Sequence, residues 1–309
     1  MDTVNFWLPN ELLGADCISN LCKNATNLTK YERNEVVSHS GNIVGNYKFN
    51  ANSYGVSFMG SLCKFYHGHN FGYLSSHEMP FAVEMLSDAL SMPMHKAKVT
   101  RLDFARTLEM DAKPKLYYDY LSTLNKSERS SIGQSLYYST AKRVLCFYDK
   151  IAESKAKSCE VPIEYLGLNL LRYELRFMNK LPGQFNVAEI TGKTISNPEF
   201  YKKVSSEWQR CFEEIIKNYK LPLDALWQQP NLNRPKDVSN ALMAILMQSL
   251  PEGEISRQMA LLREKKVFDS RPEYYSRLKS GWNDIQQIAI SNSPPILLQE
   301  LIEKVKAFA

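Results

Sequence analysis

The central strands of the predicted sheet are indicated by SLYYSTAKRVLCFYDKIAE, residues 135–153. Apolar and polar residues alternate on either side of a short turn, and this period of two predicts neighbouring strands over 131–140 and 142–150. Alternate residues of a strand point to the same side of its sheet. The second strand is therefore expected to present, on one face, Val144, Cys146, Tyr148 and Lys150.

Tyr148 and Lys150 bring a phenol close to an ammonium group on that face. The positive charge would favour the phenolate and would also neutralise a phosphate. Glu153 follows where the strand is expected to have ended. The alternative is that Tyr148 only packs in the core, since a chain with 17 tyrosines carries some beside lysines by chance.

Two further strands carry charged groups among apolar neighbours. In KVTRLDFART, residues 98–107, Asp103 shares a face with Arg101 and is either a metal ligand or half of a structural ion pair. In LNLLRYELRF, residues 168–177, three charged residues alternate with apolar ones, on a face that is either solvated or turned toward a groove for a cation and phosphates. These three residues are Arg172, Glu174 and Arg176.

KFYHGHNFGY, residues 64–73, holds His67 and His69 two positions apart. On a strand, both imidazoles would point the same way and could reach one divalent ion. In a loop turned by Gly68 and Asn70, the histidines would be incidental. Both interpretations remain open.

The expected fold class is α+β, with one largely antiparallel sheet and flanking helices. Residues 41–65 are predicted as a hairpin, 77–92 as an amphipathic helix and 113–124 as another helix, which gives the order β-β-α-β-α-β-β-β over the first 180 residues. About five helices follow from residue 197 onward, and turn-forming residues over 181–199 mark the boundary. The predicted domains are 1–195 and 196–309.

Composition is that of a soluble globular protein, with 309 residues of which 44% are hydrophobic. Residues 96–180 hold 16 Lys and Arg against 10 Asp and Glu, a local excess that suits contact with a polyanion. No apolar run is long enough to span a bilayer and no signal peptide is recognisable, so we expect a cytoplasmic protein without a membrane partner. The six cysteines lack zinc-finger spacing and indicate reduced thiols.

Missing motifs exclude several enzyme classes. The sequence has no GxxxxGK[ST] phosphate loop, which argues against an ATPase. It also has no GxGxxG or GxSxG, which argues against a dinucleotide enzyme and a hydrolase with a serine elbow.

Taken in order, KFYHGHNFGY, VTRLDFAR, SLYYSTAKRVLCFYDKIAE and LLRYELRF resemble the successive motifs of the filamentous-phage gene II/gene X type replication initiators. They are also similar to the plasmid Rep_trans-type rolling-circle initiators, whose catalytic strand carries Tyr–x–Lys–x–x–Glu. The resemblance covers roughly residues 60–178. It implies an HUH/Rep-like nicking endonuclease domain. The helical domain 196–309 lies outside the resemblance and is expected to bind DNA, oligomerise or contact a helicase.

By this resemblance, Tyr148 matches the nucleophile, Lys150 its neighbouring lysine and Glu153 the acid that closes the motif. The expected ligands of Mg²⁺ or Mn²⁺ are Asp103, Glu174 and His69. Gly68 stands where many relaxases carry a bulky residue between two histidines. The expected DNA contacts are Arg101, Arg172, Arg176, His67, Lys142 and Arg143, with Phe71, Tyr73 and Tyr137 as candidates for stacking on bases.

The implied reaction is metal-dependent nicking of single-stranded or extruded origin DNA. Attack by Tyr148 would leave a 5′-phosphotyrosyl link and a free 3′-OH that primes synthesis, and the same site would rejoin the strand without ATP. The implied partners are origin DNA, a host helicase and polymerase, and optionally a second copy of the chain.

Two other functions remain open. One is a non-catalytic DNA-binding replication accessory protein, in which residues 254–282 would form a helix-turn-helix. Such a protein would bind without metal and form no covalent complex. The other is a metal-dependent nuclease that uses water and releases free ends, with Tyr148 structural.

Overall fold

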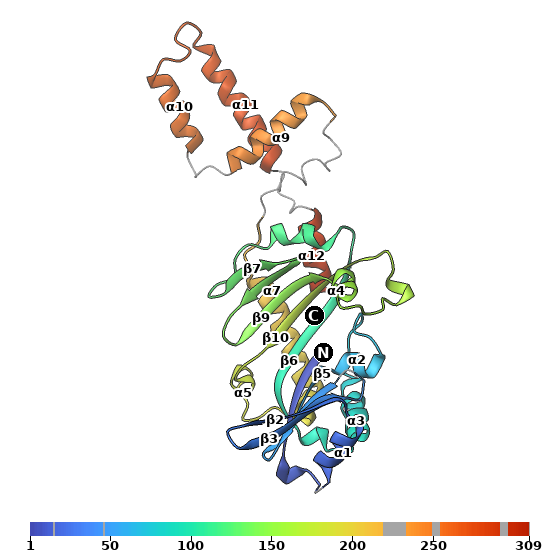
Figure 1. Cartoon of the computed structure of the whole chain (residues 1–309). Coiled ribbons are helices and arrows are strands. Elements are labelled where there is room, and N and C mark those ends of the chain that lie inside the picture. The colour runs from blue at the N-terminus through green and yellow to red at the C-terminus, as the bar shows by residue number, and fades with distance from the viewer. Residues whose placement is uncertain (15, 46, 219–232, 249–253, 291–295, 309) are drawn as a thin grey trace. The chain divides into compact units, whose positions relative to one another are not determined.

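The computed structural model describes residues 1–14, 16–45, 47–218, 233–248, 254–290 and 296–308 (Figure 1). The chain divides into two compact units. The first comprises Met1–Ile216 together with Leu301–Ala309, and the second comprises Lys217–Glu300. The sequence placed a boundary at 195/196. The two compact units divide later because the helix Pro198–Glu214 belongs to the first of them.

The first unit is built on a ten-stranded sheet in the order β2-β3-β4-β5-β1-β6-β10-β9-β8-β7. Every pair of neighbouring strands is antiparallel, which agrees with the expected α+β class. The strands are β1 (Thr3–Pro9), β2 (Thr26–Arg33), β3 (Val36–Ile43), β4 (Tyr47–Asn52), β5 (Gly55–Ser61), β6 (Lys98–Met110), β7 (Glu128–Ile132), β8 (Ser135–Ser139), β9 (Arg143–Asp149) and β10 (Asn169–Phe177).

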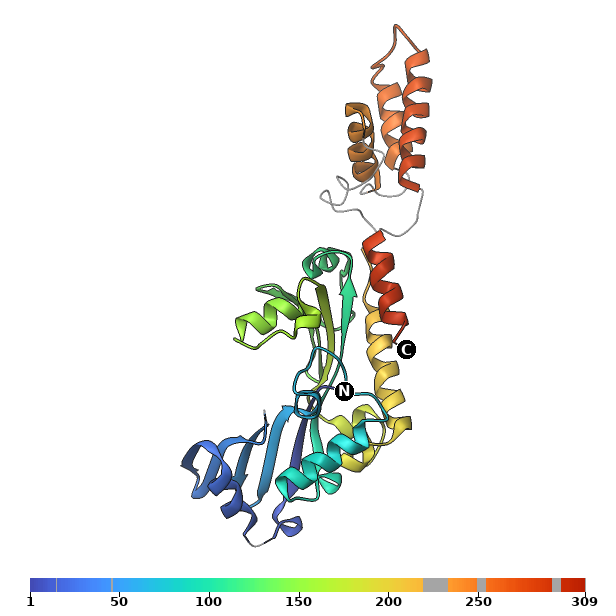
Figure 2. The ribbon, with the colours of Figure 1, turned by 90° about the vertical axis from the view of Figure 1, so that its right-hand side faces the viewer.

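Helices surround this sheet. The α-helices that begin in the first unit are α1 (Cys17–Asn24), α2 (Leu62–His67), α3 (Met79–Leu90), α4 (Lys150–Ala156), α5 (Leu181–Gln184), α6 (Gly192–Ile195) and α7 (Pro198–Glu214). The 3-10 helices are η1 (Asn10–Leu12), η2 (Met94–Lys96), η3 (Pro114–Tyr120) and η4 (Ile163–Tyr165). Seen from two sides, α3 and α7 lie on the same face of the sheet (Figures 1 and 2).

The core lies between the sheet and α7. Tyr173 of β10 stacks on Phe147 of β9, with ring centroids 4.4 Å apart, and on Trp208 of α7 at 4.6 Å. The Tyr173 hydroxyl donates to the backbone carbonyl of Trp208 at 2.9 Å. Because side chains alternate along a strand, the neighbours of these rings point to the opposite face.

Several local predictions were wrong at the N-terminal end and at turns. Residues 41–65 are not one hairpin, because they include the end of β3, the strands β4 and β5, and most of α2. The predicted strand over 131–140 contains the tight turn of the β7–β8 hairpin, where Gly133 adopts φ +60°. Residues 113–124 contain the 3-10 helix η3 instead of an α-helix.

Two motif residues lie on helices that the sequence did not predict. His67 ends α2, and Gly68 caps it in the left-handed conformation with φ +82°, so His67 and His69 do not share a strand face. Lys150 begins α4, because the Asp149 side chain accepts a hydrogen bond from the backbone N–H of Ala152 and caps the helix.

The second unit contains α9 (Pro235–Gln248), α10 (Glu254–Glu264) and α11 (Glu273–Ile290). Residues 265–272 connect α10 to α11, a longer connection than the roughly three to four residues of a helix-turn-helix. The last helix is α12 (Ile296–Lys306), whose residues from Leu301 onward belong to the first unit. Among the described helices, none combines the length and apolar character needed to cross a membrane.

We expect Trp208→Ala to destabilise the first unit by about 3–5 kcal/mol, because it opens a cavity under Tyr173 and removes the main anchor of α7. Chemical denaturation followed by circular dichroism measures the change. Phe81→Ala is the control, since Phe81 is 60% exposed on α3 and its removal should cost no more than about 0.5 kcal/mol. Equal effects of the two substitutions would contradict this account of the core.

Candidate active site

Strand register brings the sequence motifs onto the sheet face opposite α7. Arg172 pairs with Tyr148 across β10 and β9, and Arg176 pairs with Asp103 across β10 and β6. Alternation along each strand adds Glu174 to the same face. Figure 1 shows β9, β10 and β6 in front of α7, which lies behind them. Three motifs that are distant in the sequence thus meet on three adjacent strands.

Tyr148 and Glu174 form the centre of this face. The Tyr148 hydroxyl donates to Glu174 Oε2 at 3.1 Å, and Arg176 Nε donates to Glu174 Oε1 at 2.9 Å. Burial and the negative charge of Glu174 raise the pKa of the Tyr148 phenol well above its usual value. Burial opposes ionisation of Glu174, but the charges of Arg176 and Arg172 hold the pKa of its carboxyl below the usual value. The resting pair is therefore a neutral phenol and a carboxylate.

Only a small part of Tyr148 reaches the surface of the site. Its side chain is buried among the strands, with 8% of the residue exposed. The hydroxyl points to a carboxylate that belongs to the same polar face. The phenol is therefore close to an acid on the neighbouring strand, as nucleophilic chemistry at Tyr148 requires.

Asp103 forms a second carboxylate beside Glu174. Arg101 donates to both of its oxygens, through Nε at 2.9 Å and Nη2 at 2.6 Å. Burial raises the pKa of Asp103 to about 7, and the charge of Glu174 adds to this effect while Arg101 opposes it. Two neighbouring carboxyl groups with pKa values shifted in opposite directions are typical of an acid and base pair.

Arg172 is fully buried and connects four segments of the chain. Its Nη2 donates to Asp2 Oδ2 at 2.6 Å, and its Nη1 donates to the Asn70 carbonyl at 2.7 Å and to Thr107 Oγ1 at 2.8 Å. This arginine was expected to contact DNA, but its guanidinium is committed inside the protein. Its role in the structure is to hold the loop that follows α2 and the start of β1 against β10.

Asp2 is the functional neighbour that the sequence did not reveal. Its Oδ1 accepts from the Ser61 hydroxyl at 2.5 Å while Oδ2 accepts from Arg172. Burial works against its ionisation, but Arg172 and Ser61 lower the pKa of the carboxyl below its usual value. The only sequence signal was an acid directly before the apolar alternation of β1, which is too common a pattern to indicate a site.

Lys150 and Glu153 pair with each other at the start of α4. Lys150 Nζ lies 2.9 Å from Glu153 Oε2, and it also lies 5.2 Å from the centre of the Phe71 ring. Burial and the charge of Arg172 lower the pKa of Lys150. The expected motif is thus assembled, but the direct partner of the Tyr148 hydroxyl is Glu174, and Lys150 binds the acid that closes the motif.

His69 lies on the loop that Arg172 holds, and His67 is the last residue of α2 before that loop. His69 packs edge-on against Phe71 and Tyr165, and His67 lies 3.5 Å from Glu78 Oε1. Phe71 is buried and stacks on Tyr165 with ring centroids 5.0 Å apart, so its ring is not free to stack on a base.

Other residues expected to contact DNA lie on different surfaces. Arg143 points to the α7 face, where it binds Glu207 at 2.6 Å and Gln184 at 2.6 Å. Tyr73 packs against Arg106 at 3.9 Å and against Phe308. Lys142 is exposed in the turn before β9. Three of the expected residues have side chains on the site face that are at least partly exposed, namely Arg101, Arg176 and Tyr137.

The carboxylates, as they are arranged, do not fit a divalent cation. Arg101 binds both oxygens of Asp103, and Arg176 and Tyr148 bind the two oxygens of Glu174. Within the described part of the chain, no group of three or more His, Cys, Asp or Glu side chains is placed to hold a metal ion. The metal site of Asp103, Glu174 and His69 therefore stays a prediction from the sequence.

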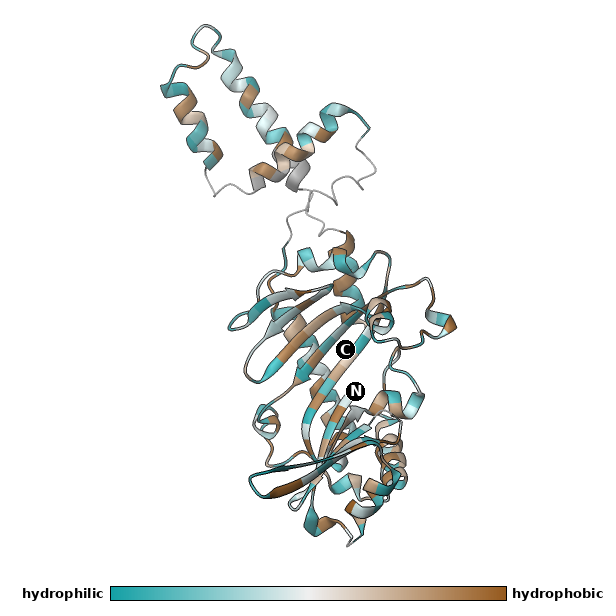
Figure 3. Cartoon of the chain, in the orientation of Figure 1, coloured by the Kyte–Doolittle hydropathy of each residue, from teal (hydrophilic) through white to brown (hydrophobic). Residues whose placement is uncertain are grey.

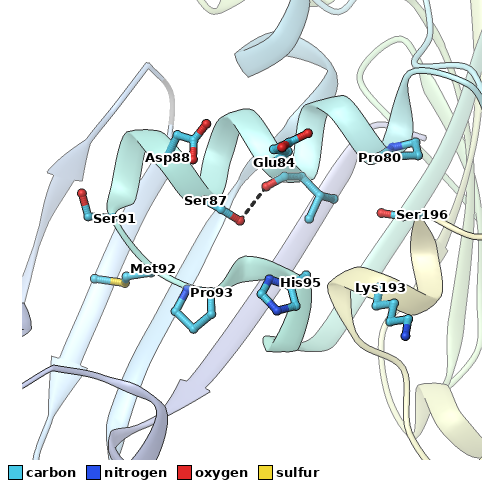
Figure 4. Close-up of a pocket in the computed structure, with 11 residues that line it drawn as sticks. Pro80, Glu84, Ser87, Asp88, Ser91, Met92, Pro93, His95, Lys193 and Ser196 are labelled. Carbon is cyan, nitrogen blue, oxygen red and sulfur yellow. Dashed lines mark hydrogen bonds between the residues drawn. The ribbon is translucent and has the colours of Figure 1, made fainter.

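A separate pocket of about 730 Å³ lies between α3, η2 and α6 (Figure 4). None of the residues around Tyr148 lines it. Its Ser87 hydroxyl donates to the Val83 carbonyl within α3 at 2.9 Å, so this group is satisfied by its own helix. The charged residues along the pocket have mixed sign, namely Glu84, Asp88 and Lys193. The pocket is not part of the site described above.

Comparison with known proteins identifies one family. Residues 2–209, about two thirds of the chain, match the family of the filamentous-phage gene II replication-associated protein, in its N-terminal part. This range contains all ten strands, α7 up to Gln209, and every residue of the polar face described above. No curated protein matches the chain significantly.

We expect Arg172→Met to destabilise the first unit by about 3–5 kcal/mol, because it leaves the Asp2 carboxylate buried without its cation. Arg210→Met is the control, since it removes a half-exposed arginine from ion pairs on α7 and should cost at most about 1 kcal/mol. Adding Asp2→Asn to Arg172→Met should recover part of the loss. Urea denaturation measures all three, and a loss below about 1 kcal/mol for Arg172→Met would refute its structural role.

Proposed function

Since the chain belongs to the family of phage gene II replication-associated proteins, whose N-terminal region it matches, we propose that it initiates rolling-circle DNA replication by nicking single-stranded origin DNA with Tyr148. The proposal includes an HUH/Rep-like nuclease role for the sheet of the first unit. The observation that carries it is the 3.1 Å hydrogen bond from the Tyr148 hydroxyl to the buried carboxylate of Glu174. A nucleophile with a base in hydrogen-bond reach is the minimal machinery for transesterification.

Glu174 acts as the general base in this mechanism. As the Tyr148 oxygen attacks the scissile phosphorus, its proton passes to Glu174 Oε2, the Oη–P bond forms and the bond from phosphorus to the 3′ oxygen breaks. The products are a 5′-phosphotyrosyl enzyme and a 3′-OH end. Because the raised pKa of Tyr148 keeps the phenol protonated at rest, the proton transfer has to accompany the attack.

Asp103 and the arginines serve the other half of the reaction. With a pKa of about 7, Asp103 is partly protonated at neutral pH and supplies the proton that the leaving 3′ oxygen takes up. Arg101 and Arg176 are partly exposed and can bind the non-bridging oxygens. Rejoining runs the same steps backward: the 3′-OH attacks the phosphotyrosine, Asp103 accepts its proton and Glu174 returns one to Tyr148.

Metal dependence and partners are separate parts of the proposal. Mg²⁺ or Mn²⁺ would act as a Lewis acid on the phosphate, and the steps above use none. Nicking that persists in excess EDTA would show that no metal is needed, and loss of nicking would show that one is. Family membership supports origin DNA as a partner, and a host helicase, a polymerase and self-association remain proposals of the same rank. A non-catalytic DNA-binding protein would yield no cleaved strand, and a nuclease that uses water would yield free ends only.

We expect the full chain, mixed with end-labelled single strands that tile its own replicon, to form a covalent protein–DNA adduct visible on a denaturing gel. Tyr148→Phe should abolish both the adduct and the nick, because it removes the attacking oxygen. Tyr137→Phe is the matched control and should retain full activity, because it removes a hydroxyl from the same face but keeps the ring that was expected to stack on bases. A persistent adduct in Tyr148→Phe would refute the assignment.

In the same assay, Glu174→Gln should slow adduct formation by about 10²–10⁴-fold, the usual contribution of a general base. Glu109→Gln, an exposed acid on β6, should have no effect.

The nicking rate should also fall as the pH rises through about 7, by up to tenfold per pH unit, because Asp103 loses the proton that the leaving oxygen needs. On the acid side, the nicking rate should fall only below the usual pKa of a glutamate, because the lowered pKa of Glu174 keeps this base ionised until then. Initial rates from pH 5 to pH 9 measure the profile. Asp103→Asn should be slower and should lack the fall above pH 7, and an unchanged profile in this variant would exclude Asp103 as the acid.

A further inference from the structure

The face that carries Tyr148 continues across the sheet beyond β6. Asn5 of β1 pairs with Arg101, and a β-bulge follows between Asn5 and Phe6, so that Trp7 pairs with Lys98. Pairing of β1 with β5 and of β5 with β4 extends both rows. The first row is Arg101, Asn5, Met59 and Lys48. The second row is Lys98, Trp7, Ser57 and Asn50.

These two rows form an accessible surface, called here the β1–β5–β4 surface. Their alternating neighbours on β1, Val4, Phe6 and Leu8, are fully buried, so the core lies on the other side of the sheet. Lys48 is exposed, Met59 is 45% exposed and Trp7 is partly exposed. The helices α3 and α7 lie on the opposite side in both views (Figures 1 and 2).

The chemistry of this surface suits a nucleic acid strand. Its eight residues include three cations, two asparagines, one serine, one tryptophan and one methionine, and no carboxylate. Lys98 Nζ lies 3.0 Å from Glu189 Oε2 at the rim, and because both side chains are about half exposed, this pair can open to a phosphate. The neighbouring strands β2 and β3 carry hydrophilic residues over much of their length, with a hydrophobic stretch where β3 begins (Figure 3). A protein interface of this size would be expected to have an apolar centre, whereas cations and amides around one aromatic side chain are typical of single-strand binding.

Trp7 is held in place by a glycine. A Cβ at Gly55 would lie 2.8 Å from Trp7 Cζ2 and 2.2 Å from the Leu8 carbonyl, so only glycine leaves room for the indole there. The ring is therefore positioned before any ligand binds. A rigid aromatic surface stacks on a base with little loss of conformational freedom.

We propose that the β1–β5–β4 surface binds the unpaired DNA strand next to the nicking site, with one base stacked on Trp7 and the backbone close to Lys48 and Lys98. This inference rests on the proposed function, and it names where the substrate strand lies outside the catalytic residues. The surface is continuous with the site, because Arg101 belongs to its first row and binds Asp103. From β9 to β1 there are three strand spacings, about 14 Å.

Titration of a fluorescently labelled oligothymidylate with the full chain, carrying Tyr148→Phe to prevent cleavage, tests the inference. Trp7→Ala should weaken binding about tenfold, the loss expected for one base stack, and Trp7→Phe should weaken it less than about threefold. Annealing the probe to oligoadenylate should weaken its binding to the protein that retains Trp7, because a duplex hides the faces of the bases. Phe81→Ala, an exposed aromatic on α3, should leave the affinity unchanged.

A second pair of variants tests the charge. Lys48→Glu should weaken binding and reduce its salt dependence, whereas Lys30→Glu, an exposed lysine on the other face of β2, should not. Wild-type affinity in Trp7→Ala, or equal effects within either control pair, would overturn the inference. Thermal unfolding checks that each variant is folded.

The outcomes separate this inference from the proposed function. Binding that depends on Trp7 without any covalent adduct at Tyr148 would refute nicking and leave the surface in place. An adduct together with affinity that is independent of Trp7 would refute the surface and leave nicking in place.

Discussion

The buried guanidinium of Arg172 is the interaction on which the rest of the site depends. It lies next to Tyr148 in the strand register, and its donors reach Asp2, the Asn70 carbonyl and Thr107. Removing an arginine from water is costly unless its hydrogen bonds are met by well-placed acceptors. The acceptors come from the start of β1, the loop after α2 and β6, so the cost is offset only when these segments are assembled around β10. The geometry at Tyr148 is therefore coupled to the folding of the whole sheet.

The charges on the polar face help to shift the pKa values of its two buried carboxyl groups in opposite directions. Glu174 is flanked by the charges of Arg176 and Arg172 and stays ionised, whereas Asp103 faces burial and the charge of Glu174, and its pKa rises to about 7. In water, the pKa values of an aspartate and a glutamate would lie close together. The proposed mechanism uses this difference, with Glu174 as the base and Asp103 as the acid on neighbouring strands.

The sequence predicted the central strands well because their signal is local. Alternation in β6, β9 and β10 identifies both faces, and it placed Tyr148, Glu174 and Asp103 on interrupted apolar strands that do meet. What it missed depends on contacts between distant segments. Asp2 gains its role only through Arg172, 170 residues away, and Lys150 leaves the strand because Asp149 caps a helix. Arg143 was assigned to DNA from its charge, although alternation along β9 places it on the face opposite Tyr148, where it binds Glu207.

The two faces of the sheet have complementary roles. Each functional residue lies between core residues of its own strand: Tyr148 follows Phe147, and Glu174 follows Tyr173, whose ring is stacked between Phe147 and Trp208. Packing on the α7 face therefore fixes the backbone from which the polar side chains project. A site built this way is rigid before substrate binds. In the proposed reaction it is therefore the DNA that has to adapt its shape to the site, and an unpaired strand bends to the sheet far more easily than a duplex.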